Sequence, residues 1–261
     1  LNGKEAIFVL STEQVNIYRK NGFLVVRELL DQAQLQPLRR RTYEIAEGLV
    51  EFPTENIEFE PDGLGRDNRI DKLRKLNHCA QHDRIFLEHA NNPDILDVVE
   101  GLIGPDIKLL SDQLFMKPPG GMEKTYHQDS PYFPIEPMDL VSSWVALDDV
   151  TLDNGCLWVV PGSHLNGPKE HSEKWMVGDR EDMHVPDKEI DREKECPILL
   201  KSGDVSFHHS LLLHRSGPNE SQFRRRGLAT HFMSARSRWT GNLSEKPDYV
   251  LLRGKAHLGC V

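Results

Sequence analysis

The sequence predicts an α+β chain that is mainly β, with helices first and a sandwich or barrel of strands after them. Two observations carry this prediction. Up to residue 106, apolar residues recur at helical spacing between capping residues. From residue 107 onward, short strand-like segments follow one another without intervening helices, which is typical of packed sheets. At 261 residues the chain fits one domain, 1–261, with helical support in 1–106, a β core in 107–235 and a C-terminal extension in 236–261.

The helices of the first part are predicted from their capping signals. Capping boxes begin one helix at Ser11 and a longer one at Asp31, and an asparagine cap at Asn92 begins a third. A short strand, 22–27, separates the first two helices. The longer helix is expected to bury one face, formed by Leu35, Leu38, Thr42, Ile45 and Leu49.

The second part contains five predicted strands bounded by glycine, proline and asparagine turns. These strands cover residues 107–117, 141–147, 156–160, 204–207 and 224–233. Two segments, 51–69 and 166–197, lack a clear period and are expected to be loops. Segment 166–197 is long and charged, and loops of that length usually act as lids or binding loops, so we expect it to lie at the barrel mouth.

Composition argues against several classes of function. The net charge of −9 disfavours nucleic-acid binding, because phosphate neutralisation needs clustered cations. No run approaches the roughly 18 apolar residues of a membrane span, and the first ten residues lack a signal-peptide layout. Four cysteines without CxxC spacing favour a reduced, intracellular protein, which we expect to be cytoplasmic. The sequence does not indicate an oligomeric state, and because it begins at Leu1 it leaves open whether residues precede it.

His127-Gln128-Asp129 is a candidate metal-binding motif. In a strand, residues i and i+2 point to the same side, so His127 and Asp129 can hold one ion together. A carboxylate with a neutral imidazole suits Fe(II) or Mn(II). The motif alone is weak, because chance predicts about one His-x-Asp triplet in a chain of this composition.

A second histidine and an arginine strengthen the motif. His214 ends an apolar run and precedes Arg225 by eleven residues, so we predict a hairpin with both side chains pointing into one cavity. Two histidines and one aspartate form the facial triad of non-haem iron oxygenases, which leaves metal positions open. Arg225 would be an unfavourable buried charge unless an anion such as the dicarboxylate 2-oxoglutarate pairs with it. Alternation places Arg224 and Arg226 on the other face, where we expect them to be solvated.

Other histidines offer alternatives to this set. His208 and His209 lie close enough to His214 to replace it as a ligand, although the spacing to Arg225 favours His214. His231 lies on the Arg225 face of its strand and is predicted to be a packed, hydrogen-bonded histidine.

Three blocks resemble the phytanoyl-CoA dioxygenase family of Fe(II)/2-oxoglutarate oxygenases, and the resemblance runs over nearly the whole chain. The blocks are 127–134 (HQDSPYFP), 144–164 (from WVALDD through NGCLWVVPGSH) and 203–232. Three blocks in this order are far more specific than a single triplet. The resemblance implies a double-stranded β-helix, a jelly-roll of the cupin type, with the N-terminal helices packed on its major sheet.

The resemblance also assigns residues. The family's iron ligands fall on His127, Asp129 and His214, and its arginine for the distal carboxylate of 2-oxoglutarate falls on Arg225. Other residues that line the family's co-substrate pocket correspond to Gln128, Trp144, Ser216 and Lys75. For the lysine, the neighbouring Lys72 and Arg74 remain open.

The implied activity is oxidation of a small organic substrate, with Fe(II), 2-oxoglutarate and O2 as cofactor and co-substrates and with release of succinate and CO2. Halogenating relatives have a small residue where this chain retains Asp129, which favours hydroxylation. Two alternatives remain: a sensor or pseudoenzyme that binds metal and 2-oxoglutarate, and a non-catalytic cupin-like module that holds Mn or Zn. Turnover of the co-substrate distinguishes the enzyme from both.

Overall fold

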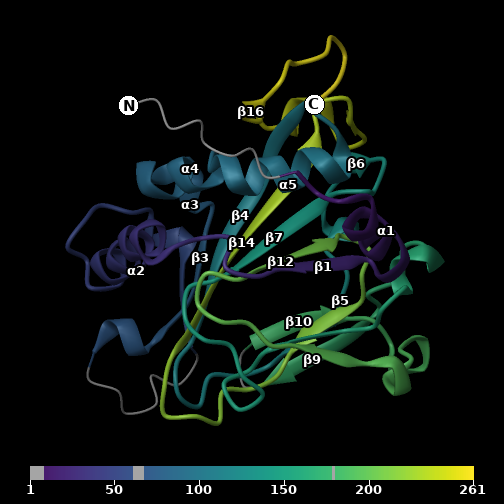
Figure 1. The fold of residues 1–261 in the computed structure, drawn as a ribbon. Coiled ribbons are helices and arrows are strands. Elements are labelled where there is room, and N and C mark those ends of the chain that lie inside the picture. Colours follow the sequence, from purple (N-terminus) through teal and green to yellow (C-terminus); the bar gives the residue numbers. More distant parts are fainter. Residues whose placement is uncertain (1–8, 61–67, 178–179) are drawn as a thin grey trace.

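Two β-sheets face each other, and helices cover the outer side of the larger sheet (Figure 1). The computed structural model describes residues 9–60, 68–177 and 180–261, and of the side chains of 175–183 nothing is described. Most of the first ten residues, where the sequence lacks a signal-peptide layout, therefore lie outside the described residues. So does 61–67, which is part of the expected loop 51–69.

The helices begin where the capping signals place them. The side chains of Ser11 and Asp31 accept hydrogen bonds from the backbone N–H groups of Gln14 and Gln34, as predicted. The described α-helices are α1 (Thr12–Asn21), α2 (Gln32–Ala46), α3 (Cys79–His82), α4 (Arg84–Ala90) and α5 (Pro93–Ile103). None of these helices combines the length and apolar character that a bilayer crossing requires.

The predicted buried face of α2 is correct except at Leu49. Leu35, Leu38, Thr42 and Ile45 are buried. The helix ends at Ala46, and Gly48 then takes a positive φ of 71°, which turns the chain away from the helix axis. Leu49 follows this turn and is 66% exposed.

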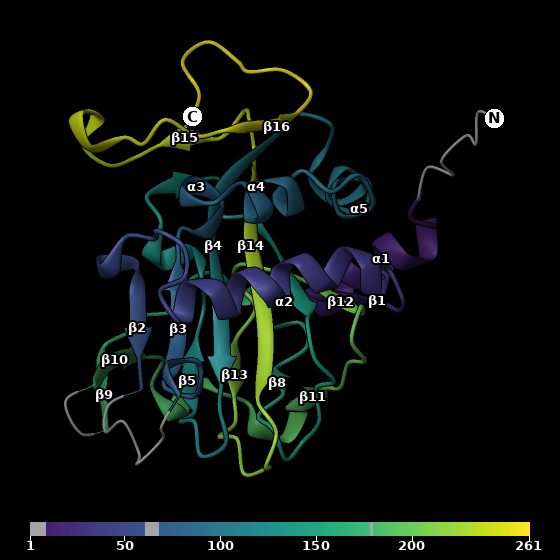
Figure 2. The ribbon, with the colours of Figure 1, turned by 90° about the vertical axis from the view of Figure 1, so that its left-hand side faces the viewer.

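The larger sheet has eight described strands, all antiparallel, in the order β1-β12-β7-β14-β4-β3-β2, with β16 also paired to β4. Their bounds are β1 (Phe23–Val26), β2 (Ile57–Phe59), β3 (Leu73–Asn77), β4 (Ile107–Lys117), β7 (Val141–Ala146), β12 (Val205–His209), β14 (Arg225–Ser234) and β16 (Leu251–Arg253). Figure 2 shows the C-terminal segment crossing the end of this sheet beyond α4, where β16 joins β4.

The smaller sheet has four described strands in the order β11-β8-β13-β5, and two short hairpins, β9–β10 and β6–β15, complete the strands. Their bounds are β5 (Lys124–His127), β6 (Ile135–Glu136), β8 (Leu157–Val159), β9 (Glu173–Val177), β10 (Arg180–His184), β11 (Cys196–Ile198), β13 (His214–Ser216) and β15 (Arg238–Trp239). Single 3-10 turns lie at Thr54–Asn56, Arg69–Asp71, Ser130–Tyr132, Ser163–Asn166, Asp187–Glu189, Arg192–Lys194 and Leu243–Glu245. The two facing sheets confirm the predicted double-stranded β-helix.

Strand alternation divides the core into two layers. On β7, Val141 and Val145 pack with the helices, whereas Trp144 and Ala146 turn inward to a cluster shared with the smaller sheet. The same division continues on β14, where Leu228 belongs to the helix-side cluster. The inward faces of the larger sheet therefore meet the smaller sheet, and that space holds the candidate site.

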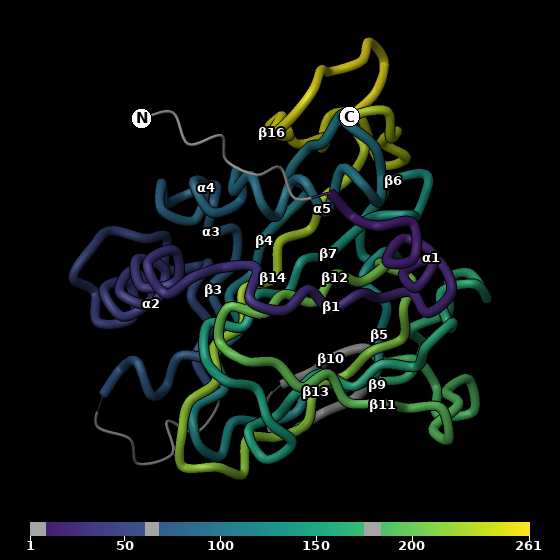
Figure 3. Tube along the Cα trace, in the orientation of Figure 1, coloured from purple at the N-terminus to yellow at the C-terminus, as the bar shows by residue number. Residues whose placement is uncertain are grey.

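The predicted hairpin between His214 and Arg225 is wrong. His214 begins β13 in the smaller sheet, whereas Arg225 begins β14 in the larger one, and the link between them passes from sheet to sheet (Figure 3). This link is held by Asn219, whose side chain donates to the carbonyl of Lys117 at 2.9 Å. The two side chains still reach one cavity, because they face each other across it rather than along one ribbon.

Segment 166–197 is not the unstructured loop that its composition suggests. It contains β9, β10, two 3-10 turns and the first residues of β11. Val185 and Ile190 are buried in a cluster with Tyr126, and the N–H of Val185 donates to the carbonyl of Tyr126 at 3.0 Å. The segment is therefore attached to β5, the strand that carries His127. Its predicted role as a lid that selects substrate stays a prediction.

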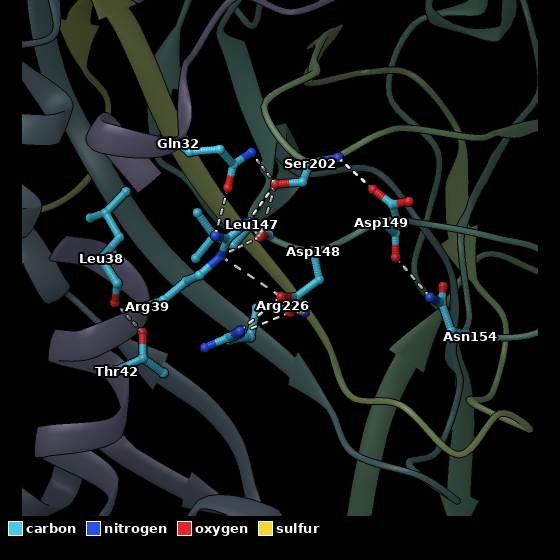
Figure 4. A network of polar contacts seen from close by, with 10 residues as sticks. All are labelled: Gln32, Leu38, Arg39, Thr42, Leu147, Asp148, Asp149, Asn154, Ser202 and Arg226. Carbon is cyan, nitrogen blue, oxygen red and sulfur yellow. Dashed lines mark hydrogen bonds and ion pairs between the residues drawn. The ribbon is translucent and has the colours of Figure 1, made fainter. Parts of the chain in front are cut away.

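A polar network fastens α2 to the larger sheet (Figure 4). The guanidinium of Arg39 donates to the carbonyl of Leu147, to the side chain of Gln32 and to the hydroxyl of Ser202. The carboxylate of Asp148 lies 3.8 Å from Arg39 and accepts two side-chain hydrogen bonds from Arg226, at 2.7 and 2.8 Å. Arg226 is therefore largely buried and paired, and the expectation that it is solvated is wrong.

We predict that Arg39→Ala lowers the free energy of unfolding by about 2 kcal/mol, because it leaves partly buried acceptors without their donor. The neighbouring Arg40 is a matched control: its side chain is 79% exposed and forms one surface pair with Glu44. Arg40→Ala should cost less than about 0.5 kcal/mol. Urea unfolding of both variants measures the difference, and equal losses would show that the network does not anchor α2.

Candidate metal centre

Three predicted ligand side chains converge between the sheets. His127 ends β5, His214 begins β13 directly opposite it, and Asp129 lies in the turn after β5. Asp129 Oδ1 lies 3.7 Å from Nε2 of each histidine. One ligand atom from each of the three residues lies within 4.8 Å of the other two. The side chains of His127, Asp129 and His214 are 13%, 12% and 8% exposed. Such spacing suits three ligands of one ion.

The backbone around Asp129 differs from the extended geometry predicted for a His-x-Asp strand. Asp129 has φ −76° and ψ −43°, and a 3-10 turn follows it. Its N–H and that of Ser130 both donate to the carbonyl of Ser210, at 2.8 and 3.0 Å. This pair of hydrogen bonds holds the turn against the chain that leads to His214, which brings the carboxylate to both histidines.

Both histidines turn Nε2 toward Oδ1 of Asp129. Nδ1 of His127 lies 2.8 Å from the carbonyl of Thr125, and Nδ1 of His214 lies 2.9 Å from the carbonyl of Leu212. A carbonyl only accepts, so each Nδ1 carries the hydrogen and each neutral ring keeps its lone pair on Nε2. Burial also lowers the pKa of His127 well below its usual value. Metal-ligating histidines are commonly oriented by such a hydrogen bond.

Asp129 supplies the charge that a cation needs. Burial alone would raise the pKa of its carboxyl group, but the neighbouring histidines, with His214 foremost, hold that pKa below its usual range. The two neutral imidazoles and the carboxylate would bind an ion from one side, and the other side of that ion would be open to a cavity of about 560 Å³. This donor set fits Fe(II) or Mn(II) with exchangeable positions.

Arg225 lies on the wall of the same cavity and is only 1% exposed. Its guanidinium donates to the carbonyl of Gly155 at 2.8 Å, while its Nε has no hydrogen-bond partner among the described residues. Burial lowers its pKa to about 10, and no carboxylate of the described part forms an ion pair with it. A buried cation in this state favours binding of an anion from the cavity.

Trp144 covers Arg225 because the neighbouring strand carries a glycine there. The guanidinium carbon lies 5.2 Å from the centre of the indole ring. A Cβ atom on Gly227 would lie 1.8 Å from Cζ2 of Trp144, so any larger residue would displace the indole. Gly227 thus lets Trp144 form part of the cavity wall, as the family resemblance implies for Trp144.

A second buried cation, Lys117, was missed in the sequence. It lies directly opposite Arg225 on β4, and its ammonium donates to the hydroxyl of Ser216 at 2.8 Å and to the carbonyl of Gly217. The signal was available, because alternation along 107–117 puts Lys117 on the same face as Phe115, which also lines the cavity. Ser216 lines the cavity as well, where the resemblance places it.

The lysine that the sequence left open lies on β3 of the same sheet, where Lys75 pairs with Phe115 of β4. Lys75 and Arg74 line the cavity, whereas Lys72 is absent from the lining residues. The ammonium of Lys75 lies 3.0 Å from the carboxylate of Glu58 and 5.9 Å from the ring centre of Phe115. The geometry favours Lys75 over Lys72 as the residue that could approach a co-substrate.

Gln128 does not line the cavity, in contrast to the role implied by the resemblance. Because it lies between two ligands that point inward, its side chain points the other way. The amide nitrogen donates to the carbonyls of Gly167 and Leu211, and the amide oxygen accepts from the N–H of Lys169 at 2.6 Å. Its backbone N–H donates to Nε2 of His171. Gln128 therefore connects the start of segment 166–197 to the turn that carries Asp129.

The histidines that the sequence offered as alternative ligands or packed residues lie in two places. His209 packs beside Tyr18 and His164, away from the cavity. His208 and His231 line the cavity close to Asp129, but neither belongs to the group of ligand atoms. Their approach to Asp129 was not predicted from the sequence.

Comparison with known families and proteins agrees with this geometry. The model of the phytanoyl-CoA dioxygenase (PhyH) family matches residues 18–227. Human peroxisomal phytanoyl-CoA dioxygenase is 34% identical over 244 residues, which cover 87% of this chain and 69% of that protein. A probable phytanoyl-CoA dioxygenase of Caenorhabditis elegans is 30% identical and covers 86% of this chain and 75% of its own length.

Solved structures share the fold. EctD from S. alaskensis, determined with 2-oxoglutarate and 5-hydroxyectoine, superposes with a TM-score of 0.74 at 20% identity, covering 100% of this chain and 89% of that chain. The non-haem monooxygenase ThoJ in its apo form has a TM-score of 0.73 at 26% identity, with 95% and 86% covered. Both similarities extend over both sheets and the helices.

We predict that the purified chain binds one divalent ion, measured by calorimetric titration with Co(II) or Mn(II). Alanine at His127, Asp129 or His214 should abolish this binding, because each variant removes one of three converging donors. His209→Ala serves as the control, since His209 is a neighbouring histidine outside the ligand group. Wild-type binding by any of the three variants would contradict the assignment of that residue.

Proposed function

Because the chain belongs to the phytanoyl-CoA dioxygenase family and is an Fe(II)- and 2-oxoglutarate-dependent dioxygenase, we propose that His127, Asp129 and His214 bind its iron. The support is the convergence of Nε2, Oδ1 and Nε2 at 3.7 Å spacings. Bound iron supplies the redox chemistry by which O2 oxidises both 2-oxoglutarate and the substrate. The residues of this chain bind, orient and shield the reacting molecules.

Arg225 is proposed to bind the distal carboxylate of 2-oxoglutarate. The single observation that carries this proposal is a buried guanidinium, without a carboxylate partner among the described residues, in the same cavity as the triad. Lys117 and Ser216 lie beside it and add a second positive charge and a hydroxyl group. Trp144 covers the guanidinium and excludes water, which strengthens its attraction for a carboxylate.

We propose hydroxylation of a small organic substrate as the reaction. A halide can bind the iron only where a small residue replaces the carboxylate ligand. This chain has Asp129 at that position, so hydroxylation is favoured over halogenation. The cavity of about 560 Å³ is large enough for 2-oxoglutarate and part of a second molecule. The names of the human and Caenorhabditis elegans relatives make acyl-CoA thioesters of the phytanoyl type the first substrates to test.

We also propose that the chain forms one functional domain. Support comes from the cavity itself, since its lining combines residues from 1–106, such as Lys75, with residues of 107–235.

We propose a cytoplasmic location. All four cysteines are free thiols, which supports a reducing compartment, although the human relative is named as peroxisomal.

We predict that Arg225→Gln raises the 2-oxoglutarate concentration needed for half-maximal turnover by roughly 100-fold or more, because the carboxylate loses a buried charge partner. Divalent-metal binding should be unchanged, since Arg225 is not a ligand. Succinate formation at increasing 2-oxoglutarate measures the first effect, and calorimetry measures the second.

Arg224→Gln is the matched control for this experiment. Arg224 directly precedes Arg225 but points outward, where it pairs with Asp71 at 2.6 Å. Its substitution should leave the 2-oxoglutarate requirement within about twofold. Equal losses from both variants would indicate a general basic patch instead of a specific pocket.

Succinate formation across a panel of acyl thioesters, free acids and amino acids tests the proposed enzyme against a sensor. A substrate should stimulate succinate release above the slow turnover that occurs without substrate. A chain that binds iron and 2-oxoglutarate yet never releases succinate, with or without any compound, would instead be a binding protein.

A further inference from the structure

A row of three polar side chains crosses the inner face of the larger sheet below Asp129. In the strand register, His208 on β12 lies opposite Ser142 on β7, and Ser142 lies opposite His231 on β14. We call these three residues the polar rung. All three are buried, so the fold places three hydrogen-bonding groups where apolar residues usually pack.

The polar rung faces one atom, Oδ2 of Asp129. The hydroxyl of Ser142 lies 3.1 Å from Oδ2 of Asp129 and 2.6 Å from Nδ1 of His231. Nε2 of His208 lies 3.8 Å from the same Oδ2, and Nδ1 of His231 lies 3.7 Å from it. The other oxygen, Oδ1, is the one that lies 3.7 Å from both ligand histidines.

The hydrogen bonds of the rung have one consistent direction. An ionised Asp129 only accepts, so the single hydroxyl hydrogen of Ser142 points to Oδ2. Ser142 must then accept from His231, which places the ring hydrogen of His231 on Nδ1. The chain of donors from His231 through Ser142 ends on Asp129, and it holds the carboxylate by an oxygen that the ligand histidines do not approach.

His208 closes the remaining side of Oδ2. Its ring centre lies 5.2 Å from that of His214, and its Nδ1 has no hydrogen-bond partner among the described residues. A buried polar atom without a partner is unfavourable, so packing alone does not account for a histidine here. With Nδ1 unpartnered, Nε2 is the ring nitrogen that His208 turns toward Oδ2 of Asp129.

We propose that the polar rung is a positioning device that keeps Oδ2 of Asp129 away from the metal, so that the carboxylate binds through Oδ1 alone. A carboxylate bound through both oxygens would occupy a coordination position that 2-oxoglutarate or O2 requires. Ser142, His208 and His231 therefore act on the metal through Asp129. The inference rests on the proposed ligation of iron by Asp129.

Ser142→Ala tests this inference, and Ser143→Ala is its matched control. Ser143 is the next residue on the same strand, is equally buried and points to the helix side, and its hydroxyl has no hydrogen-bond partner among the described residues. Ser142→Ala should weaken Co(II) binding roughly 10- to 100-fold, as loss of a hydrogen bond to a metal ligand does, and should change the visible absorption of bound Co(II). Ser143→Ala should keep wild-type affinity and spectrum.

His208 provides a second, independent test. His208→Gln keeps an N–H donor of similar reach, whereas His208→Leu removes it at similar volume. We expect His208→Leu to alter the Co(II) spectrum and to weaken 2-oxoglutarate binding to the Co(II) protein several-fold, and His208→Gln to restore both. Equal behaviour of the two variants would overturn the role of His208.

The outcomes separate the polar rung from the metal site itself. If Asp129→Ala loses Co(II) while Ser142→Ala keeps wild-type affinity and spectrum, the rung has no positioning role and the proposed ligands stand. If Asp129→Ala binds Co(II) like the wild type, the proposed ligation fails and the inference fails with it. If Ser142→Ala and Ser143→Ala lose affinity equally with equally lowered melting temperatures, the effect is general destabilisation, and the positioning role is rejected.

Discussion

The cavity between the two sheets must bury a carboxylate and a guanidinium without letting them neutralise each other. Asp129 and Arg225 come from facing sheets, line the same space and form no pair with each other. Burying an isolated charge is unfavourable by several kcal/mol. Under the proposed function each group gains a partner of opposite charge, a cation at Asp129 and an anion at Arg225. The histidines, Lys117, Trp144 and the polar rung are arranged around these two groups.

The fold supports this arrangement by giving each central strand two different faces. On β7, β12 and β14 most helix-facing residues are apolar, among them Val145, Phe207 and Leu228, and they belong to the same core cluster as residues of α2 and α5, which holds the sheet in place. The cavity-facing side of the same strands carries His208, His231 and Arg225 beside Trp144 and Ala229. Cross-strand register then sets which polar groups meet, because neighbours on adjacent strands lie only about 5 Å apart. The rigidity of the helix-packed face thus fixes the geometry of the reactive one.

Local patterns predicted much of the fold. The capping boxes at Ser11 and Asp31, and the strand 107–117, were found because each depends on a few adjacent residues. The β9–β10 hairpin in 166–197 was not found, since its charged residues conceal the alternation of a strand. The hairpin proposed between His214 and Arg225 was wrong for a related reason. Eleven residues can close a hairpin or cross between sheets, and the difference lies in contacts of Asn219 with a distant turn.

The candidate site was predictable where side chains follow strand alternation. His127, His214, Trp144 and Arg225 reach the cavity as expected. Gln128 was assigned to the cavity by resemblance alone, although alternation between two inward ligands already pointed it outward. The polar rung could not be predicted, because its three residues come from separate strands and meet only through register. Register is a property of the whole sheet and leaves no mark in any one segment.

We propose that the metal and 2-oxoglutarate occupy one cavity, with the metal at His127, Asp129 and His214 and the far carboxylate at Arg225. If so, each must promote binding of the other, because thermodynamic coupling is reciprocal. Calorimetric titration of 2-oxoglutarate into the protein without O2, with and without one equivalent of Mn(II), measures this directly. We expect Mn(II) to strengthen 2-oxoglutarate binding by roughly 10-fold or more. Identical affinity with and without Mn(II) would contradict it.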